Sequence, residues 1–282
     1  MFTTNELKAL VSLLDDPDPE VRLLIEAKIR EAGQAIVPFL EDEWRNTLHA
    51  ESQQYIEDLI HSIQFTALLQ AFREWQANGC ELITGLWLIA RYQYPDLTLA
   101  ALQNSIQQLY LEAWTYFKPN LHPVDQVREF NHIFFNKLRF APNTSNFTAV
   151  NNSMFNQVLE SRRGNPISLC VAYMLIAQKL GLPVYGVNMP NLFILTYQVD
   201  NASLFYINAF NYGRIYSRED IENYLQQLQI PIRPSYYEPC ENIDIIRRML
   251  RNLIVAYDRL SEPHKVQEVK QLLATISPDE AL

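Results

Sequence analysis

The stretch RRGNPISLCVAYMLIAQKLGLPVYGVNMPNLF, from Arg162 to Phe193, decides the fold of this chain. It begins with a glycine turn and a helix start that carries Ser168 and Cys170, and nearly every residue of that helix is apolar. A helix that is apolar on all sides is buried, so we expect it at the centre of the core. After the helix, Val184–Met189 has the composition of a strand and ends at a tight Pro-Asn corner.

Two further strands follow this corner. They are predicted over Leu192–Val199 and Leu204–Phe210, and the segment Asp-Asn-Ala-Ser between them is a turn. Connections this short indicate antiparallel pairing, which predicts a β-meander. Most of the remaining chain has apolar residues at helical spacing. The predicted fold class is therefore α+β: mostly helical, with a small antiparallel β-meander packed on a central buried helix.

The chain divides into four predicted parts. Residues 1–65 form paired helices around the turn DDPDPE and resemble one HEAT repeat, a kind of unit that usually binds other proteins. The alternative for this part is an all-α cap on a larger domain. Residues 66–140 are helical, residues 141–235 hold the buried helix and the meander, and residues 236–282 form a closing helix pair. Within them, the asparagine-rich segment 141–155 has no periodicity and is expected to be a long loop.

Composition limits the possible functions. The net charge of -9 disfavours binding to the phosphates of nucleic acid. Three widely spaced cysteines, without paired Cys/His spacing, favour a reducing compartment and indicate no metal site. The N-terminus has no cationic start before an apolar run, and no apolar run is long enough to span a bilayer. We therefore expect a cytoplasmic protein without membrane contact, and the absence of nucleotide-binding motifs predicts no cofactor.

Three stretches of the chain, in this order, resemble a known family. They are FNQVLESRRGNPISLCVAYMLIAQKLGLPVYGVNMPNLFIL (155–195), FYINAFNYG (205–213) and RMLRNL (248–253). Together they resemble the SirB-type transglutaminase-like family, and the resemblance implies a transglutaminase-like core. In the wider superfamily, which includes papain, a nucleophile at a helix N-terminus is activated by a histidine from one strand. An acid from the next strand orients that histidine.

Matched residue by residue, the chain lacks the family's base and its orienting acid. The family reads Pro-Gly-His-Phe where this chain has Pro-Asn-Leu-Phe, so Leu192 stands at the histidine position. Asn208 stands at the position of the family aspartate, and the family serine is kept as Ser168. Leucine cannot accept a proton, and asparagine cannot stabilise an imidazolium. The resemblance therefore predicts no working triad.

Ser168 and Cys170 remain the candidate catalytic residues. They lie about 200° apart around the helix, so both cannot face one substrate. In the structural alternative, the Ser168 hydroxyl satisfies a free N–H of the first helical turn, and Cys170 is a small buried residue. A lone helical histidine such as His132 is more often a packing or surface residue than a base.

Six residues are candidate binding groups in a groove around the helix start: Arg162, Arg163, Asn165, Asn191, Asn208 and Asn211. The two arginines are expected to pair with acidic side chains inside the fold, and the alternative is contact with a ligand. The four asparagines are expected near the same end of the sheet. Their amides could bind a peptide backbone, or they could satisfy the backbone of turns.

Two functions follow from this reading. The first is a pseudoenzyme: a non-catalytic binding or regulatory protein with a degenerate transglutaminase-like fold, whose partner is another protein or a peptide. The alternative is an enzyme of the cysteine-peptidase or acyl-transfer type. It would use Cys170 or Ser168 with a base from outside the motif.

Overall fold

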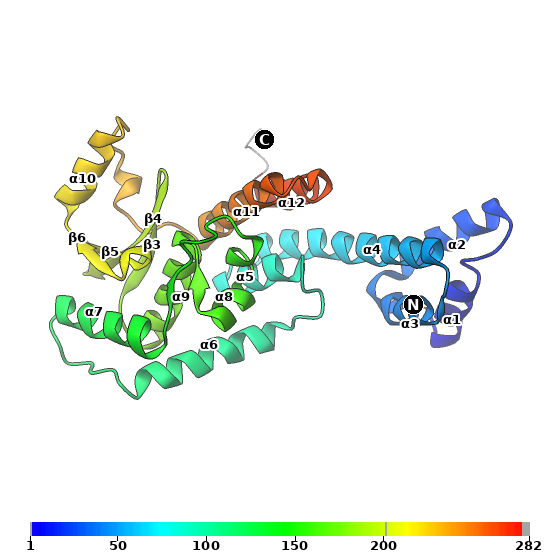
Figure 1. Cartoon of the computed structure of the whole chain (residues 1–282), viewed down its shortest axis with the longest axis horizontal. Coiled ribbons are helices and arrows are strands. Elements are labelled where there is room, and N and C mark those ends of the chain that lie inside the picture. Colours follow the sequence, from blue (N-terminus) through cyan, green and yellow to red (C-terminus); the bar gives the residue numbers. More distant parts are fainter. Residues whose placement is uncertain (1, 201, 278–282) are drawn as a thin grey trace. The chain divides into compact units, whose positions relative to one another are not determined.

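A computed structural model describes residues 2–200 and 202–277 of the chain (Figure 1). The chain forms two compact units, residues 1–71 and residues 72–282. The helices are α1 (Thr4–Ser12), α2 (Pro19–Ala32), α3 (Val37–Asn46), α4 (Ala50–Ala77), α5 (Leu82–Arg91), α6 (Leu99–Trp114), α7 (Pro123–Asn131), α8 (Phe155–Ser161), α9 (Pro166–Lys179), α10 (Arg218–Gln227), α11 (Asn242–Arg259) and α12 (Pro263–Ile276). The strands are β1 (Ala141–Pro142), β2 (Arg163–Gly164), β3 (Val184–Met189), β4 (Leu192–Val199), β5 (Ala202–Asn208) and β6 (Arg214–Tyr216).

Polar residues and one glycine set the helix ends in the N-terminal unit. Thr3 and Glu6 form a capping box at the start of α1, and Asp18 caps α2, which has Pro19 in its first turn. Gly33 ends α2 with a φ of 61°, a conformation that glycine adopts without strain. The apolar stripes of these helices meet in one core, which includes Leu7, Val11, Ile25, Ile29, Ile36, Leu40, Ile56 and Leu59.

Helix α9 is the central helix of the second unit. Its residues from Ile167 to Ala177 are all buried, as predicted for a helix that is apolar on all sides. Helices α6, α8 and α11 and strands β3 and β4 contact it. The predicted class is confirmed: the fold is mostly helical α+β, with a small antiparallel meander packed on a central buried helix (Figure 1).

The meander has the strand order β3-β4-β5-β6, and all its pairs are antiparallel. A two-residue turn joins β3 to β4 and pairs Met189 with Leu192. The third strand ends earlier than predicted. Its last two expected residues, Ala209 and Phe210, lie instead in the short 3-10 helix η4 (Ala209–Asn211), because Asn208 caps that turn with its side chain.

The two faces of this sheet pack on different helices. Side chains alternate along a strand, so Leu192 and Ile194 lie on one face of β4 and Phe193 lies on the other. The face with Leu192 and Ile194 packs on α10, in a cluster that includes Ile221. On the opposite face, the Phe193 ring lies against the backbone of Gly186, and the helices packed there are α9 and α11.

One buried residue orders the long segment 141–155 from inside. Asn152 is 2% exposed, and its Nδ2 donates to the carbonyl oxygens of Asn146 and Phe147, both at 2.9 Å. Its Oδ1 accepts a hydrogen bond from Asn143 Nδ2 at 3.0 Å. The segment is a loop, as expected, apart from β1, the 3-10 helix η3 (Val150–Asn152) and the first residue of α8. These hydrogen bonds give the loop a defined shape.

The helix predicted after Pro123 changes type at its middle, where α7 gives way to the π-helix η2 (His132–Lys137). Asn131, the last residue of α7, connects two distant parts of the unit. Its Oδ1 accepts from the Tyr173 hydroxyl at 2.9 Å, and its Nδ2 donates to the Gly213 carbonyl at 2.8 Å. Gly213 has a φ of 73°, and a Cβ there would overlap the Asn131 amide group. Only glycine fits this position.

Candidate functional site

The start of α9 holds the two candidate nucleophiles, and the first of them is part of a helix cap. Asn165 is the N-cap residue: its Oδ1 accepts from the Ser168 N–H at 3.0 Å, and its own N–H donates to Ser168 Oγ at 3.0 Å. The Ser168 hydroxyl also donates to Asn165 Oδ1 at 3.0 Å. Ser168 is 0% exposed. Its hydroxyl therefore holds the helix start, which is the arrangement that the structural alternative predicts.

Cys170 lies one turn behind this cap and is also 0% exposed. Its thiol donates to the carbonyl oxygen of Phe193 at 3.5 Å. Burial raises the pKa of the Cys170 thiol to about 12, although a hydrogen bond from the backbone N–H of Ala209 acts in the opposite direction. A thiol with this pKa is protonated at neutral pH and is a poor nucleophile.

The two positions that the family fills with histidine and aspartate do not face α9. Leu192 packs in the apolar cluster between the sheet and α10. Asn208 comes two residues after Tyr206, a member of the same cluster, so its side chain lies on the same face of the sheet. Helix α9, which carries both candidate nucleophiles, packs on the other face, where Cys170 contacts Phe193. The side chains at positions 192 and 208 are therefore of the wrong type and also point away from α9, so they cannot activate Ser168 or Cys170.

The candidate asparagines mainly support turns and helix starts. Asn165 caps α9, and Asn208 accepts from the Asn211 N–H at 3.1 Å to cap η4. Asn191 is exposed in the β3–β4 turn with a φ of 59°, a left-handed conformation that asparagine adopts more readily than most residues. Asn211 Nδ2 donates to the Tyr216 hydroxyl at 3.4 Å. Each of the four asparagines therefore has a role in a turn, a helix start or a hydrogen bond to a nearby residue.

The prediction that Arg162 and Arg163 pair with acidic side chains is wrong. Arg163 Nη1 donates to the carbonyl oxygens of Arg139 at 3.2 Å and of Arg162 at 3.4 Å. Arg162 ends α8 in the left-handed conformation, with a φ of 58°, and its guanidinium lies 5.1 Å from the centre of the Phe140 ring. Within residues 2–200 and 202–277, no carboxylate lies within ion-pair distance of either arginine. A ring face and backbone carbonyls take the places expected for acids.

Arg248 of α11 has a structural role that the sequence analysis did not assign. Its Nη1 donates to Asn188 Oδ1 at 2.5 Å and to the carbonyl oxygens of Met189 at 2.6 Å and Leu192 at 3.2 Å. These bonds tie α11 to the β3–β4 turn. The sequence contains an indication of this role, because Arg248 comes three residues after the buried Ile245. It therefore lies on the apolar stripe of its helix, where a charged side chain needs a partner.

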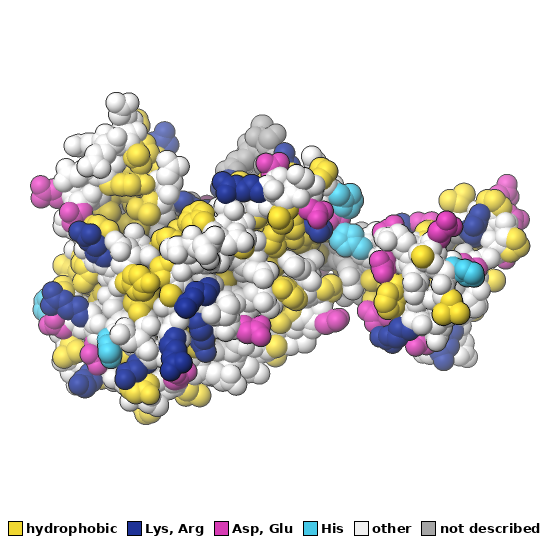
Figure 2. Space-filling view, in the orientation of Figure 1, with side chains coloured by type: hydrophobic (Ala, Val, Ile, Leu, Met, Phe, Trp, Pro, Cys, Tyr) yellow, Lys and Arg dark blue, Asp and Glu magenta, His cyan; other side chains and the backbone are white. Residues whose placement is uncertain are grey.

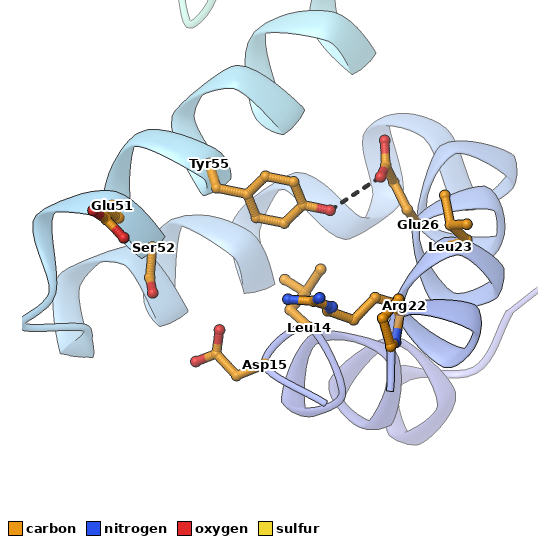
Figure 3. A pocket seen from close by; sticks show the side chains of 9 residues that line it. Leu14, Asp15, Arg22, Leu23, Glu26, Glu51, Ser52 and Tyr55 are labelled. Atoms are coloured by element: carbon orange, nitrogen blue, oxygen red, sulfur yellow. Dashed lines mark hydrogen bonds between the residues drawn. The ribbon is translucent and has the colours of Figure 1, made fainter. Parts of the chain in front are cut away.

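The N-terminal unit contains a groove of about 420 Å³ (Figure 3). It lies between α2, the turn before α2 and the start of α4. Leu14, Leu23 and Tyr55 line it, and the Tyr55 hydroxyl donates to Glu26 at 3.1 Å. In Figure 3 the Arg22 side chain points into the groove toward Leu14. Leu23 is 69% exposed, and exposed apolar side chains beside a groove are typical of a protein-contact surface.

The described part of the chain, residues 2–200 and 202–277, holds no helix that is long and apolar enough to cross a membrane. Over the same residues, no group of three or more His, Cys, Asp or Glu side chains is arranged to hold a metal ion. Acidic and basic side chains are interspersed on the face that Figure 2 shows, with hydrophobic side chains between them.

Comparisons with known proteins identify several relatives of this chain. The chain is 32% identical to a UPF0162 protein of Xylella fastidiosa over 186 residues, which are 62% of this chain and 64% of that protein. It is 25% identical to a UPF0162 protein of Vibrio cholerae over 206 residues, which are 72% of this chain and 76% of that protein. It is also 25% identical to F-box only protein 21 of Mus musculus over 219 residues, 72% of this chain and 32% of that protein.

The chain thus spans about 64% of the length of the Xylella relatives that it matches. No solved structure gives a significant match. Residues 100–251, more than half of the chain, match the transglutaminase-like superfamily, and this range includes α9, the whole meander and Arg248. On this match, together with the antiparallel meander packed on a buried central helix, the chain belongs to the transglutaminase-like superfamily.

Proposed function

We propose that this protein is a non-catalytic binding or regulatory protein with a degenerate, SirB-type transglutaminase-like core, and that its partner is another protein or a peptide. The observation that carries the proposal is the burial of both candidate nucleophiles, since Ser168 and Cys170 are each 0% exposed. A substrate has to reach the nucleophile and a base together. Neither side chain is open to such a contact.

The chemistry of the two side chains supports the same conclusion. The Ser168 hydroxyl is held in the helix cap, and the pKa of Cys170 is raised to about 12 by burial. An enzyme of the cysteine-peptidase or acyl-transfer type would need a thiolate or an activated hydroxyl beside a base. The residues at the family's base and acid positions, Leu192 and Asn208, lie on the far face of the sheet. These observations oppose the enzymatic alternative.

The partner contact is assigned in this proposal to the N-terminal part, residues 1–65, acting as a HEAT-like unit. Residues 66–140, 141–235 and 236–282 then build the core that carries it. The groove beside Tyr55 supports the assignment, because its lining is both apolar and charged and includes Leu23, which is 69% exposed. The next residue, Leu24, lies outside the lining and is 62% exposed. Such side chains become buried when a partner covers them.

Thiol labelling tests the non-catalytic part of the proposal. The folded protein is treated with a small electrophile at pH 6, and modification of each cysteine is followed by mass spectrometry. We expect Cys170 to stay unmodified on the time scale on which a free model thiol reacts, and to react fully once the chain is unfolded. Rapid labelling of Cys170 in the folded protein at pH 6 would contradict the proposal.

Affinity capture tests the partner contact, and point variants of the full chain suit it best. A cut after residue 65 would divide α4, which runs from Ala50 to Ala77. We therefore compare Leu23→Asp with the matched control Leu260→Asp, whose leucine is 61% exposed and lies in the second unit. Proteins captured by the unmodified chain and by the control should be lost with Leu23→Asp. Equal recovery of the captured proteins with both variants would contradict the assignment of the contact to the N-terminal unit.

A further inference from the structure

The net charge of the chain is concentrated in its N-terminal unit. Residues 1–71 contain 13 acidic and 5 basic residues, a net charge of -8. Residues 72–282 contain 19 acidic and 18 basic residues, a net charge of only -1. A unit of this size that carries most of the -9 of the whole chain attracts cationic partners and repels anionic ones.

The groove beside Tyr55 belongs entirely to this acidic unit. Its volume of about 420 Å³ falls in the range of about 300–1,000 Å³ that is usual for binding sites in proteins. Leu14, Leu23 and Tyr55 contribute apolar surface to its lining. The groove can therefore accept apolar side chains of a partner, and the charges around it decide which partner these side chains come from.

Two carboxylates that line the groove have no partner within the described part of the chain. Asp15 lies in the turn before α2, and Glu51 lies in the first turn of α4 (Figure 3). Both residues are exposed, and neither side chain takes part in a hydrogen bond or an ion pair there. The third carboxylate, Glu26, is bound by Arg30 at 2.7 Å and by the Tyr55 hydroxyl at 3.1 Å. Asp15 and Glu51 are thus the carboxylates that can bind a cation from a partner.

Arg22 adds one positive charge to the lining, but the negative charges outnumber it. The lining holds three carboxylates and one guanidinium. The turn DDPDPE, residues 15–20, carries four carboxylates and borders the groove through Asp15 and Pro19. The Arg22 side chain points toward Leu14 (Figure 3). A partner whose charge is complementary to this surface is therefore basic.

We propose that this groove binds a basic segment of a partner protein, in which apolar side chains are interspersed with lysine or arginine. The apolar side chains pack on Leu14, Leu23 and Tyr55, and the cations bind Asp15 and Glu51. The inference rests on the proposed binding function and names the chemistry of the partner. A second copy of this chain is a poorer occupant, because a symmetric contact through the groove would bring together two units that each carry a charge of -8.

The probe is the peptide Lys-Leu-Lys-Lys-Leu-Lys, acetylated and amidated at its ends. Its binding to the full chain is measured by titration in protein-observed NMR at low salt. The peptide Glu-Leu-Glu-Glu-Leu-Glu keeps the leucines and reverses the charge, and Lys-Ser-Lys-Lys-Ser-Lys keeps the charge and lacks the leucines. We expect saturable binding of the probe, and affinities at least about tenfold lower for the other two peptides.

The double variant Asp15→Asn/Glu51→Gln tests the two carboxylates of the groove. The matched control, Glu31→Gln/Asp42→Asn, removes the same charge from two exposed positions of the same unit that do not line the groove. We expect the first variant to weaken the probe about three- to tenfold, because it removes two local ion pairs, and the control to weaken it less than about twofold. The comparison separates local contact from the overall charge of the unit.

Absence of probe binding would overturn the inference, as would equal binding of either comparison peptide or an equal loss of affinity with both double variants. A dimer in analytical ultracentrifugation that Leu23→Asp dissociates would assign the groove to a second copy and would overturn it as well. The peptide results leave the capture experiment on Leu23→Asp untouched, because that experiment asks only whether this unit contacts a partner. Failure of the basic-partner assignment can therefore be told apart from failure of the proposed function.

Discussion

Substitution of Gly213 by alanine probes the contact that joins α7, α9 and the end of the meander. The change adds a Cβ that would lie 2.5 Å from Asn131 Nδ2 and closer still to the other two atoms of that amide group. Gly213 also has a φ of 73°, so the alanine is strained even without a neighbour. Both effects act on the folded state, and we expect a clear loss of stability.

The two contributions can be separated. A left-handed backbone costs an alanine about 1–2 kcal/mol, and inserting a methyl group into packed surroundings adds about 1–3 kcal/mol. Gly213→Ala should therefore lower the free energy of unfolding by roughly 2–5 kcal/mol. Gly181→Ala is the control for backbone strain alone, because Gly181 has a φ of 85° and no atom lies within 4 Å of its Cβ position. We expect it to cost about 1–2 kcal/mol.

A double-mutant cycle with Asn131→Ala completes the experiment. Asn131→Ala leaves the buried Tyr173 hydroxyl without its partner, at a cost of about 1–3 kcal/mol. It also removes the clash, so that Gly213→Ala in this background should cost only the strain of about 1–2 kcal/mol. Urea denaturation is followed by intrinsic fluorescence, since three of the four tryptophans (75, 87 and 114) belong to the second unit. Equal costs of Gly213→Ala in the two backgrounds would refute the reasoning.

Three further outcomes are expected. Arg248→Met should lower the free energy of unfolding, measured in urea, by about 2–4 kcal/mol, because three acceptors at the β3–β4 turn lose their donor. The exposed control Arg128→Met should change this free energy by less than about 0.5 kcal/mol. Asn165→Ala should cost about 1–2 kcal/mol and Asn165→Asp much less, since aspartate keeps the capping oxygen. The hydrogen bond from Arg30 lowers the pKa of Glu26. The stabilisation that this bond gives the folded state is therefore complete above the ordinary carboxyl pKa, and it is lost as the pH falls through the lowered pKa. The difference in Tm between the unmodified chain and Glu26→Gln should accordingly shrink from pH 7 to pH 3, and a constant difference would contradict this role.

The sequence was sufficient to predict the centre of the fold. A long apolar run without a polar face favours a buried helix, and consecutive short strands with tight turns favour a meander. The start of α10 also has a local signal in the sequence, since Ser217 and Asp220 form a capping box there. These features depend on residues close together in the chain, whose physical preferences agree with the final structure.

The features that the sequence did not predict depend on contacts between distant residues. Alternation along β4 separates Leu192 from Phe193, but which face meets α9 is decided by how the helices pack around the sheet. The ion pair expected for Arg162 is not formed, because its guanidinium packs on the Phe140 ring and Glu112 acts on it only through its charge. The π-helix that begins at His132 likewise has no local signal in the sequence.

The cap at the start of α9 has a consequence for how relatives of this protein are recognised. Because the Ser168 hydroxyl is engaged by Asn165, its part in folding is enough to account for the segment Asn-Pro-Ile-Ser without any catalytic role. In a genome survey, that segment therefore does not by itself identify an active member. An active member is identified by a different property: a thiol or hydroxyl that solvent can reach, with a histidine beside it.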